Sequence, residues 1–210
     1  MKIICVGKNY ADHASEMGGD APTTPLVFGK FPNTLVGPGE PIRLPEGIGH
    51  VDAEAELCVE IGMGGHRIPE GRALEHIRGY RCANDVSARD IQYSESQWTR
   101  AKGFDTFCPL GDTIAPVSEL GDGGGLRVVQ RLNGEVIQDG NTRDLIFSVP
   151  HLVSFVSSVF TLEPGDLILT GTPAGVGYAR DPKLSMKPGD TVEVEIEGIG
   201  LLSNPVVAEA

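Results

Sequence analysis

Residues 53–62, with the sequence AEAELCVEIG, carry the pattern that decides the fold and the candidate site of this chain. Apolar and polar residues alternate there, which is typical of a β-strand with one face toward a core. Glu54 and Glu56 would then share one face, about 6–7 Å apart, while their neighbours Ala53, Ala55 and Leu57 face the core. Glu60 continues the acidic face, so a solvated strand face without a function is the alternative interpretation.

The rest of the sequence predicts a mostly β protein of the α+β class with a few short helices. Its 210 residues include 28 glycines and 15 prolines, which favours short strands joined by turns and excludes a bundle of long helices. Asn133-Gly134 predicts a two-residue hairpin, because both turn positions need a positive φ. Besides 53–62, strands are expected over residues 2–7, 79–84, 126–132, 135–138, 167–171 and 191–198.

Short helices are expected over residues 9–17, 69–78, 85–97 and 149–160. Ser87 is expected to cap the third of these helices, and Ser148 with Pro150 marks the start of the fourth. The fourth is the clearest, because its apolar residues fall on one face: Val149, Leu152, Val153, Val156 and Phe160. No linker or low-complexity tract interrupts the sequence, so residues 1–210 are expected to form one domain.

The charge and the cysteines exclude several classes of protein. A formal net charge of −12 disfavours nucleic acid as a partner, since an acidic surface repels phosphates. No apolar run approaches the roughly 18 residues of a membrane span, and no signal peptide is evident. The four cysteines form no CxxC pair. We therefore expect a cytoplasmic protein with free thiols and no membrane partner.

Asp85 is the third carboxylate of interest, because it follows a strand expected to be buried. Three carboxylates at close range would need a cation, since like charges raise one another's pKa and cost stability. Oxygen ligands suit Mg²⁺, Mn²⁺ or Ca²⁺, and no histidine or cysteine stands at zinc spacing around them. Whether Asp85 lies near Glu54 and Glu56 does not follow from the sequence.

His13 and Glu16 share a face if residues 9–17 are helical. A glutamate bonded to one imidazole nitrogen would orient the ring and raise its basicity, which is the arrangement of a general base. A surface His–Glu pair without a function is the alternative.

Two further features could contribute to a site. Lys102, between small and aromatic residues, could stabilise an oxyanion, although most lysines are simply solvated. The glycine-rich segment 171–177 follows an expected strand and could hold a carboxylate through its backbone N–H groups, or be a plain turn. It matches neither the Walker A nor the dinucleotide-binding pattern.

Six segments, taken in order along the chain, are similar to those of one enzyme family. They are Gly7-Lys8-Asn9-Tyr10-Ala11-Asp12-His13, Glu54-Ala55-Glu56-Leu57, Asn84-Asp85-Val86-Ser87-Ala88-Arg89-Asp90-Ile91-Gln92, Ala101-Lys102-Gly103-Phe104-Asp105, Asn133-Gly134 and Thr170-Gly171-Thr172-Pro173-Ala174-Gly175-Val176-Gly177. Together they resemble the fumarylacetoacetate hydrolase family, above all its short members, and they cover nearly the whole chain.

The resemblance implies a mixed β-roll or sandwich fold, a Mg²⁺ or Mn²⁺ site for which Ca²⁺ is a poorer match, a small 2-oxo acid as substrate, and a homodimer. The implied metal ligands are Glu54, Glu56 and Asp85. The implied catalytic residues are His13, Glu16 and Lys102, the first two on a lid segment of about residues 7–20. The implied substrate contacts are Arg89, Gln92, Gly171 and Thr172.

The resemblance also implies an activity, which we expect to be C–C bond hydrolysis of an acylpyruvate through a metal-stabilised enolate. Isomerisation or decarboxylation of 2-hydroxyhepta-2,4-diene-1,7-dioate-type intermediates of aromatic catabolism, or oxaloacetate decarboxylation or tautomerisation, would use the same enolate and is the alternative. A β module that holds a cation for structure alone is the non-enzymatic alternative. His50-Val51-Asp52-Ala53 departs from the paired histidines that many family members carry before the first glutamate.

Overall fold

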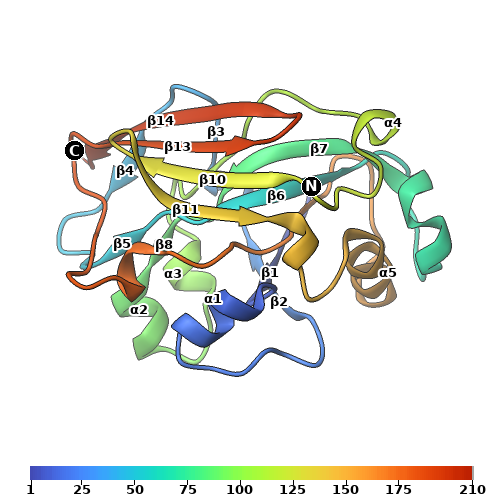
Figure 1. The fold of residues 1–210 in the computed structure, drawn as a ribbon, viewed down its shortest axis with the longest axis horizontal. Helices are drawn as coiled ribbons and strands as arrows, with labels where there is room; N and C mark the ends of the chain where they lie inside the picture. The colour runs from blue at the N-terminus through green and yellow to red at the C-terminus, as the bar shows by residue number, and fades with distance from the viewer. Residues whose placement is uncertain (210) are drawn as a thin grey trace.

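The computed structural model describes residues 1–209 and contains two five-stranded sheets that pack against each other (Figure 1). The first sheet has the strand order β2-β1-β12-β6-β7. Its strands are β1 (Ile3–Gly7), β2 (Leu26–Lys30), β6 (Ala55–Ile61), β7 (Ile77–Asn84) and β12 (Leu167–Leu169). β1 pairs with β12 in parallel, whereas β6 is antiparallel to both β12 and β7.

The second sheet has the order β11-β10-β13-β14-β4. Its strands are β4 (Ile42–Leu44), β10 (Arg127–Leu132), β11 (Glu135–Asn141), β13 (Thr191–Ile196) and β14 (Gly200–Ala208). The predicted hairpin is confirmed, since Asn133 and Gly134 join β10 to β11 with φ values of 53° and 82°. β14 was not expected, because Pro205 interrupts the pattern of its sequence.

The main core lies between the two sheets. Leu57 and Val59 of β6 pack there with Val128 of β10 and Val194 of β13, all of them buried. The residues of β6 thus alternate between this core and the opposite face of the sheet, as the sequence predicts. That opposite face is where a site can form, because it is not covered by the second sheet.

Helix α5 (Val149–Val159) closes one end of the core (Figure 1). Ser148 caps it by accepting a hydrogen bond from the His151 backbone N–H, as expected, and four of the five predicted apolar residues are buried. The expectation for Phe160 is wrong. It lies beyond the last helical turn in an extended conformation and is 38% exposed, so it leaves the apolar face.

The other helices are short. They are α1 (Ala11–Glu16), α2 (Arg89–Ser94), α3 (Thr99–Lys102), α4 (Val117–Leu120) and 3₁₀ turns over Pro32–Thr34, Glu70–His76, Thr142–Asp144 and Gly177–Ala179. The helix expected over 69–78 is therefore a 3₁₀ turn that ends where β7 begins. The helix expected over 85–97 is also shorter, because residues 87–88 are extended.

Ser87 does not cap a helix, contrary to expectation. It belongs to β8 (Ser87–Ala88), which pairs with β5 (Val51–Asp52), and its hydroxyl donates to the Asp85 carbonyl. A second short pair joins β3 (Leu35–Val36) to β9 (Cys108–Pro109). The pairing of β8 with β5 outweighs the local helical preference and delays the start of α2 until Arg89.

The mostly β, α+β class predicted from the sequence is confirmed by these elements. The four cysteines are buried free thiols, and burial raises the pKa of Cys108 to about 12. Within residues 1–209 we find no helix with the length and hydropathy that a membrane crossing requires.

Candidate active site

Three carboxylates meet on the face of the first sheet that points away from the main core. Glu54 precedes β6 and Glu56 lies within it, so the strand alternation turns both side chains to this face. Asp85 follows β7, whose antiparallel register pairs Ala55 with Asn84. The Asp85 backbone N–H therefore donates to the Glu54 carbonyl at 2.9 Å. One oxygen from each of the three buried carboxylates lies within 4.8 Å of the other two.

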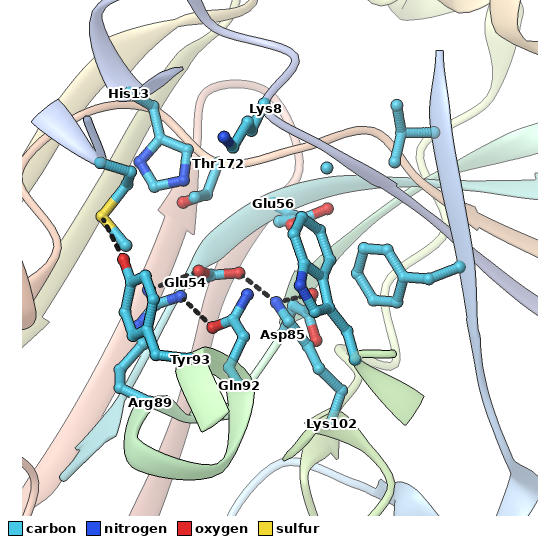
Figure 2. A pocket seen from close by; sticks show the side chains of 15 residues that line it. Lys8, His13, Glu54, Glu56, Asp85, Arg89, Gln92, Tyr93, Lys102 and Thr172 are labelled. Atoms are coloured by element: carbon cyan, nitrogen blue, oxygen red, sulfur yellow. Dashed lines mark hydrogen bonds and ion pairs between the residues drawn. The ribbon is translucent and has the colours of Figure 1, made fainter. Parts of the chain in front are cut away.

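Two buried lysines neutralise part of this negative charge. The ammonium of Lys102, the last residue of α3, lies 2.7 Å from Glu54 Oε2 and 2.5 Å from Asp85 Oδ2. The ammonium of Lys30, at the end of β2, lies 2.6 Å from Asp85 Oδ1 and donates to the Lys102 carbonyl. Lys102 thus stands directly at the carboxylates, on the other side of the cluster from His13 (Figure 2).

Burial and neighbouring charges shift the pKa values of the two glutamates in opposite directions. Burial alone would raise the pKa of Glu54, but the charges of Lys102 and Arg89 outweigh it and hold that pKa well below its usual range. Burial, together with the charges of Asp85 and Glu54, raises the pKa of Glu56 well above its usual range. Burial would lower the pKa of Lys102, yet Asp85 and Glu54 hold it above its ordinary value, so this lysine stays charged.

Arg89, the first residue of α2, joins the cluster to β5. Its Nε donates to Asp52 Oδ2 at 2.8 Å and its guanidinium also donates to Glu54 Oε1 at 2.5 Å. Gln92, one turn along α2, accepts from Arg89 at 2.8 Å. Asp52 is buried and also pairs with His50 at 2.7 Å, so it holds the Arg89 side chain in a fixed position.

His13 and Glu16 lie on α1 and form the predicted pair. His13 Nδ1 lies 2.7 Å from Glu16 Oε1, while Glu16 Oε2 accepts from the Gly175 backbone N–H at 2.8 Å. The glutamate therefore ties α1 to the glycine-rich segment and sets the direction of the imidazole ring. The ring turns toward the space above the carboxylates (Figure 2).

The glycine-rich segment 171–177 contacts the carboxylate cluster through Gly171. The Gly171 backbone N–H donates to Glu56 Oε2 at 2.7 Å, so this group holds a carboxylate of the protein instead of facing a substrate. A Cβ on Gly171 would lie 2.8 Å from Asn9 Cβ, and its φ is 104°, so a glycine is required. The Thr172 hydroxyl accepts from Gln138 of β11 at 2.7 Å.

A cavity of about 100 Å³ opens between these side chains (Figure 2). Its lining includes eight of the residues singled out in the sequence: His13, Glu54, Glu56, Asp85, Arg89, Gln92, Lys102 and Thr172. Glu16 and Gly171 are not part of the lining, but each is bonded to a residue that is. The structure thus brings every candidate residue to one place.

Residues 2–207 match the family described as fumarylacetoacetate (FAA) hydrolase, C-terminal. The chain belongs to the fumarylacetoacetate hydrolase family. It is 46% identical over 208 residues to a mitochondrial oxaloacetate tautomerase of Xenopus laevis, which covers 98% of this chain and 65% of that relative. The chain therefore spans about two thirds of the length of this curated relative.

Two solved structures of the fumarylacetoacetate hydrolase family are similar throughout. A 2-hydroxyhepta-2,4-diene-1,7-dioate isomerase from Mycobacterium marinum is 45% identical with a TM-score of 0.87, covering 100% of this chain and 75% of that one. Fumarylpyruvate hydrolase from Pseudomonas aeruginosa, solved with Mn²⁺ and pyruvate, is 35% identical with a TM-score of 0.90, covering 100% and 90%. The family is thus one of enzymes with more than one reaction.

The donor set fits a hard divalent cation. All three converging side chains are carboxylates, which Mg²⁺ and Mn²⁺ prefer to sulfur or nitrogen. The charged groups in contact around the cluster are Asp52, Glu54, Glu56, Asp85, Lys30, Arg89 and Lys102. The carboxylates exceed the cations by one, and a cation bound between them would relieve the repulsion that raises the pKa of Glu56.

Sequence reasoning missed several residues of this family site. Asp52, Lys30 and Gln138 support Arg89, Asp85 and Thr172 by direct hydrogen bonds or ion pairs, and Trp98 and Tyr93 line the cavity. Asp52 had a signal, since it stands two residues before Glu54 and so shares its strand face. No sequence signal pointed to Lys30 or Gln138, because they lie on strands that are distant from Glu54 along the chain.

Proposed function

We propose that this protein is a divalent-metal-dependent enzyme that moves a proton at the carbon beside the keto group of a small 2-oxo acid. Keto–enol tautomerisation of an oxaloacetate-like acid is the reaction that the site supports best. The observation that carries the proposal is one cavity with the three carboxylates on one side and the His13–Glu16 pair on the other. The 46% identity to an oxaloacetate tautomerase supports the same reaction.

Different residues of the chain bind the metal, transfer the proton and stabilise the charge that forms. A divalent cation held by Glu54, Glu56 and Asp85 would supply a Lewis acid for the 2-oxo group. His13 takes the proton from the carbon through Nε2, because Nδ1 is occupied by Glu16. Glu16 stabilises the imidazolium that forms. The proton then passes to the enolate oxygen, so the substrate leaves as its enol, and the reverse sequence regenerates the keto acid.

Lys102 and Arg89 stabilise negative charge as the proton leaves. Both are buried and permanently charged, and both are held in place by carboxylates before the substrate arrives. Fixed charges in a site shielded from water need no reorganisation during the reaction.

The cavity favours a short substrate. Its volume of about 100 Å³ suits a small acid. Phe28 and Trp98 form an apolar wall that limits a longer chain, and their rings lie 5.3 Å apart.

C–C hydrolysis of an acylpyruvate is the second candidate, and one observation favours it. The His13–Glu16 pair could equally activate a water molecule, which tautomerisation does not need. The likeness to fumarylpyruvate hydrolase supports this reaction at 35% identity.

The absorbance of enol oxaloacetate distinguishes tautomerisation from C–C hydrolysis. The purified protein with Mg²⁺ should speed the loss of enol absorbance without releasing pyruvate, and EDTA should abolish the effect. Pyruvate release from acetylpyruvate, with no effect on oxaloacetate, would select hydrolysis instead. A melting temperature that rises with Mg²⁺ but no turnover of either compound would support a purely structural cation.

A further inference from the structure

We propose that Lys8 binds a second carboxylate at the far end of the substrate, so that the enzyme prefers 2-oxo dicarboxylic acids. This inference rests on the function proposed above, whose oxaloacetate-like substrate is already a dicarboxylic acid, and adds the residue that recognises the second carboxylate. It assigns a specificity-determining role to a residue outside the carboxylate cluster.

Lys8 belongs to the cavity but not to its charge network. It follows β1, is half-buried, and its side chain turns into the cavity beside His13 and Thr172 (Figure 2). Its φ of 57° lies in the left-handed region, which few residues other than glycine adopt. Such conformations gather at functional sites, where the surrounding structure maintains them.

The other cations of the cavity wall are already paired. Arg89 is bonded to Asp52 and Glu54, and Lys102 to Glu54 and Asp85. Within residues 1–209, the ammonium of Lys8 has no carboxylate within ion-pair distance and makes no hydrogen bond. It is therefore the lining cation that can accept an anion without breaking an existing pair.

The position of Lys8 suits the distal end of a substrate. Figure 2 shows it with His13 and Thr172 on one side of the carboxylates, opposite Lys102 and Arg89. A ligand whose 2-oxo acid end meets the carboxylate cluster would extend its other end toward Lys8. The Lys8 ammonium lies beside Gly19, where the absence of a side chain leaves room for it, since a Cβ on Gly19 would lie 2.7 Å from that ammonium.

The expected gain is a preference that can be measured. A charge-assisted hydrogen bond in a partly shielded cavity contributes about 10- to 100-fold in affinity. A methyl group in place of the second carboxylate should lose this factor. Without Lys8 the two ligands should bind about equally.

The test compares a matched pair of stable ligands in the presence of Mg²⁺. 2-Oxoglutarate and 2-oxopentanoate differ only in a terminal carboxylate in place of a methyl group. Calorimetry should show the wild-type protein binding the first at least about tenfold more tightly. In Lys8→Met the ratio should fall to within about twofold, chiefly through weaker binding of 2-oxoglutarate.

Two variants guard against trivial explanations. Lys8→Arg keeps the charge and should retain most of the preference, which shows that the backbone tolerates substitution there. Lys187→Met removes an exposed lysine outside the cavity lining and should keep the wild-type ratio, which excludes a net-charge effect.

Three results would overturn the assignment. The wild-type protein could show no preference, the preference could survive in Lys8→Met, or both ligands could weaken equally. Turnover of oxaloacetate is measured separately. A preference that depends on Lys8 in a protein that does not tautomerise oxaloacetate would refute the proposed reaction and leave the carboxylate site standing.

Discussion

His13 Nδ1 lies 2.7 Å from Glu16 Oε1, and the second oxygen of this carboxylate is held at 2.8 Å by the Gly175 backbone N–H. The imidazole is therefore oriented by a group that is itself anchored to another segment of the chain. This arrangement gives the ring a defined tautomer, with Nε2 left for the cavity. It is the geometric basis of the proton transfer proposed above.

Glu16→Gln should lower kcat by about 10- to 100-fold with little change in KM, because the amide keeps the contact but no longer stabilises an imidazolium. His13→Gln should cost about 10²- to 10⁴-fold. Steady-state rates with oxaloacetate measure both. His66→Gln, at an exposed histidine, serves as the control and should retain wild-type rates. Full activity in Glu16→Gln would contradict the role of the pair.

Lys102→Met should destabilise the metal-free protein by about 3–5 kcal/mol, because it leaves the buried Glu54 and Asp85 without their shared cation. Denaturant unfolding in EDTA measures the change, and added Mg²⁺ should recover part of it. Arg127→Met breaks an exposed ion pair with Asp139 and should change stability little. Equal effects from the two variants would argue against a buried charge cluster.

Glu56→Gln should stabilise the metal-free protein at neutral and higher pH. The pKa of Glu56 is raised in the folded state, so its ionisation costs stability as pH rises through that value. Below the ordinary glutamate pKa of about 4.3 the carboxyl is protonated in both states, and the advantage of the variant should vanish. Denaturant unfolding in EDTA, from below this pKa to above neutral pH, measures the difference in stability between the variant and the wild-type protein.

The same unfolding measurements with Mg²⁺ present test the role of Glu56 as a metal ligand. The cation should stabilise the wild-type protein more than Glu56→Gln, because the variant lacks one ligand. Glu46→Gln, at an exposed glutamate, should follow the wild type throughout. An advantage of Glu56→Gln that grows as pH falls would reverse the predicted sign.

Gly171→Ala should cost about 2–4 kcal/mol, since its Cβ would meet Asn9 and its φ is strained for other residues. Gly39→Ala is the matched control. Its φ of 77° is also left-handed, but a Cβ there meets nothing within 4 Å, so about 1–2 kcal/mol is expected. Thermal unfolding compares them, and equal losses would show that the contact with Asn9 is unimportant.

The parts of the fold that could be predicted from the sequence are those set by local chemistry. The alternation around Glu54 and Glu56, the Asn133-Gly134 turn and the apolar face of α5 each depend on a few neighbouring residues. The expectation for Ser87 was wrong, and β14 was not predicted, because strand pairing decided both. Ser87 is drawn into an extended pair with Asp52, and Pro205 is tolerated in a strand with partners on both sides.

The site shows the same division. Glu54 and Glu56 follow from one strand, whereas Asp85 reaches them only through the register of β6 with β7. Residues 62–76 separate these strands, and no local rule fixes a register across them. Lys30 comes from β2, a still more distant strand. Only the resemblance to the family joined the segments, because it encodes the tertiary register that the residues alone do not.

Deuterium uptake at C3 of 2-oxoglutarate in D₂O, followed by proton NMR, reports directly whether the protein transfers a proton at the carbon beside the keto group. This acid can exchange its C3 protons but cannot decarboxylate as oxaloacetate does, so the signal reports proton transfer alone. We expect exchange that requires Mg²⁺ or Mn²⁺, stops with EDTA, and is lost in both Glu54→Gln and His13→Gln. Exchange that persists in either variant, or none in the metal-loaded wild-type protein, would contradict the proposed proton transfer.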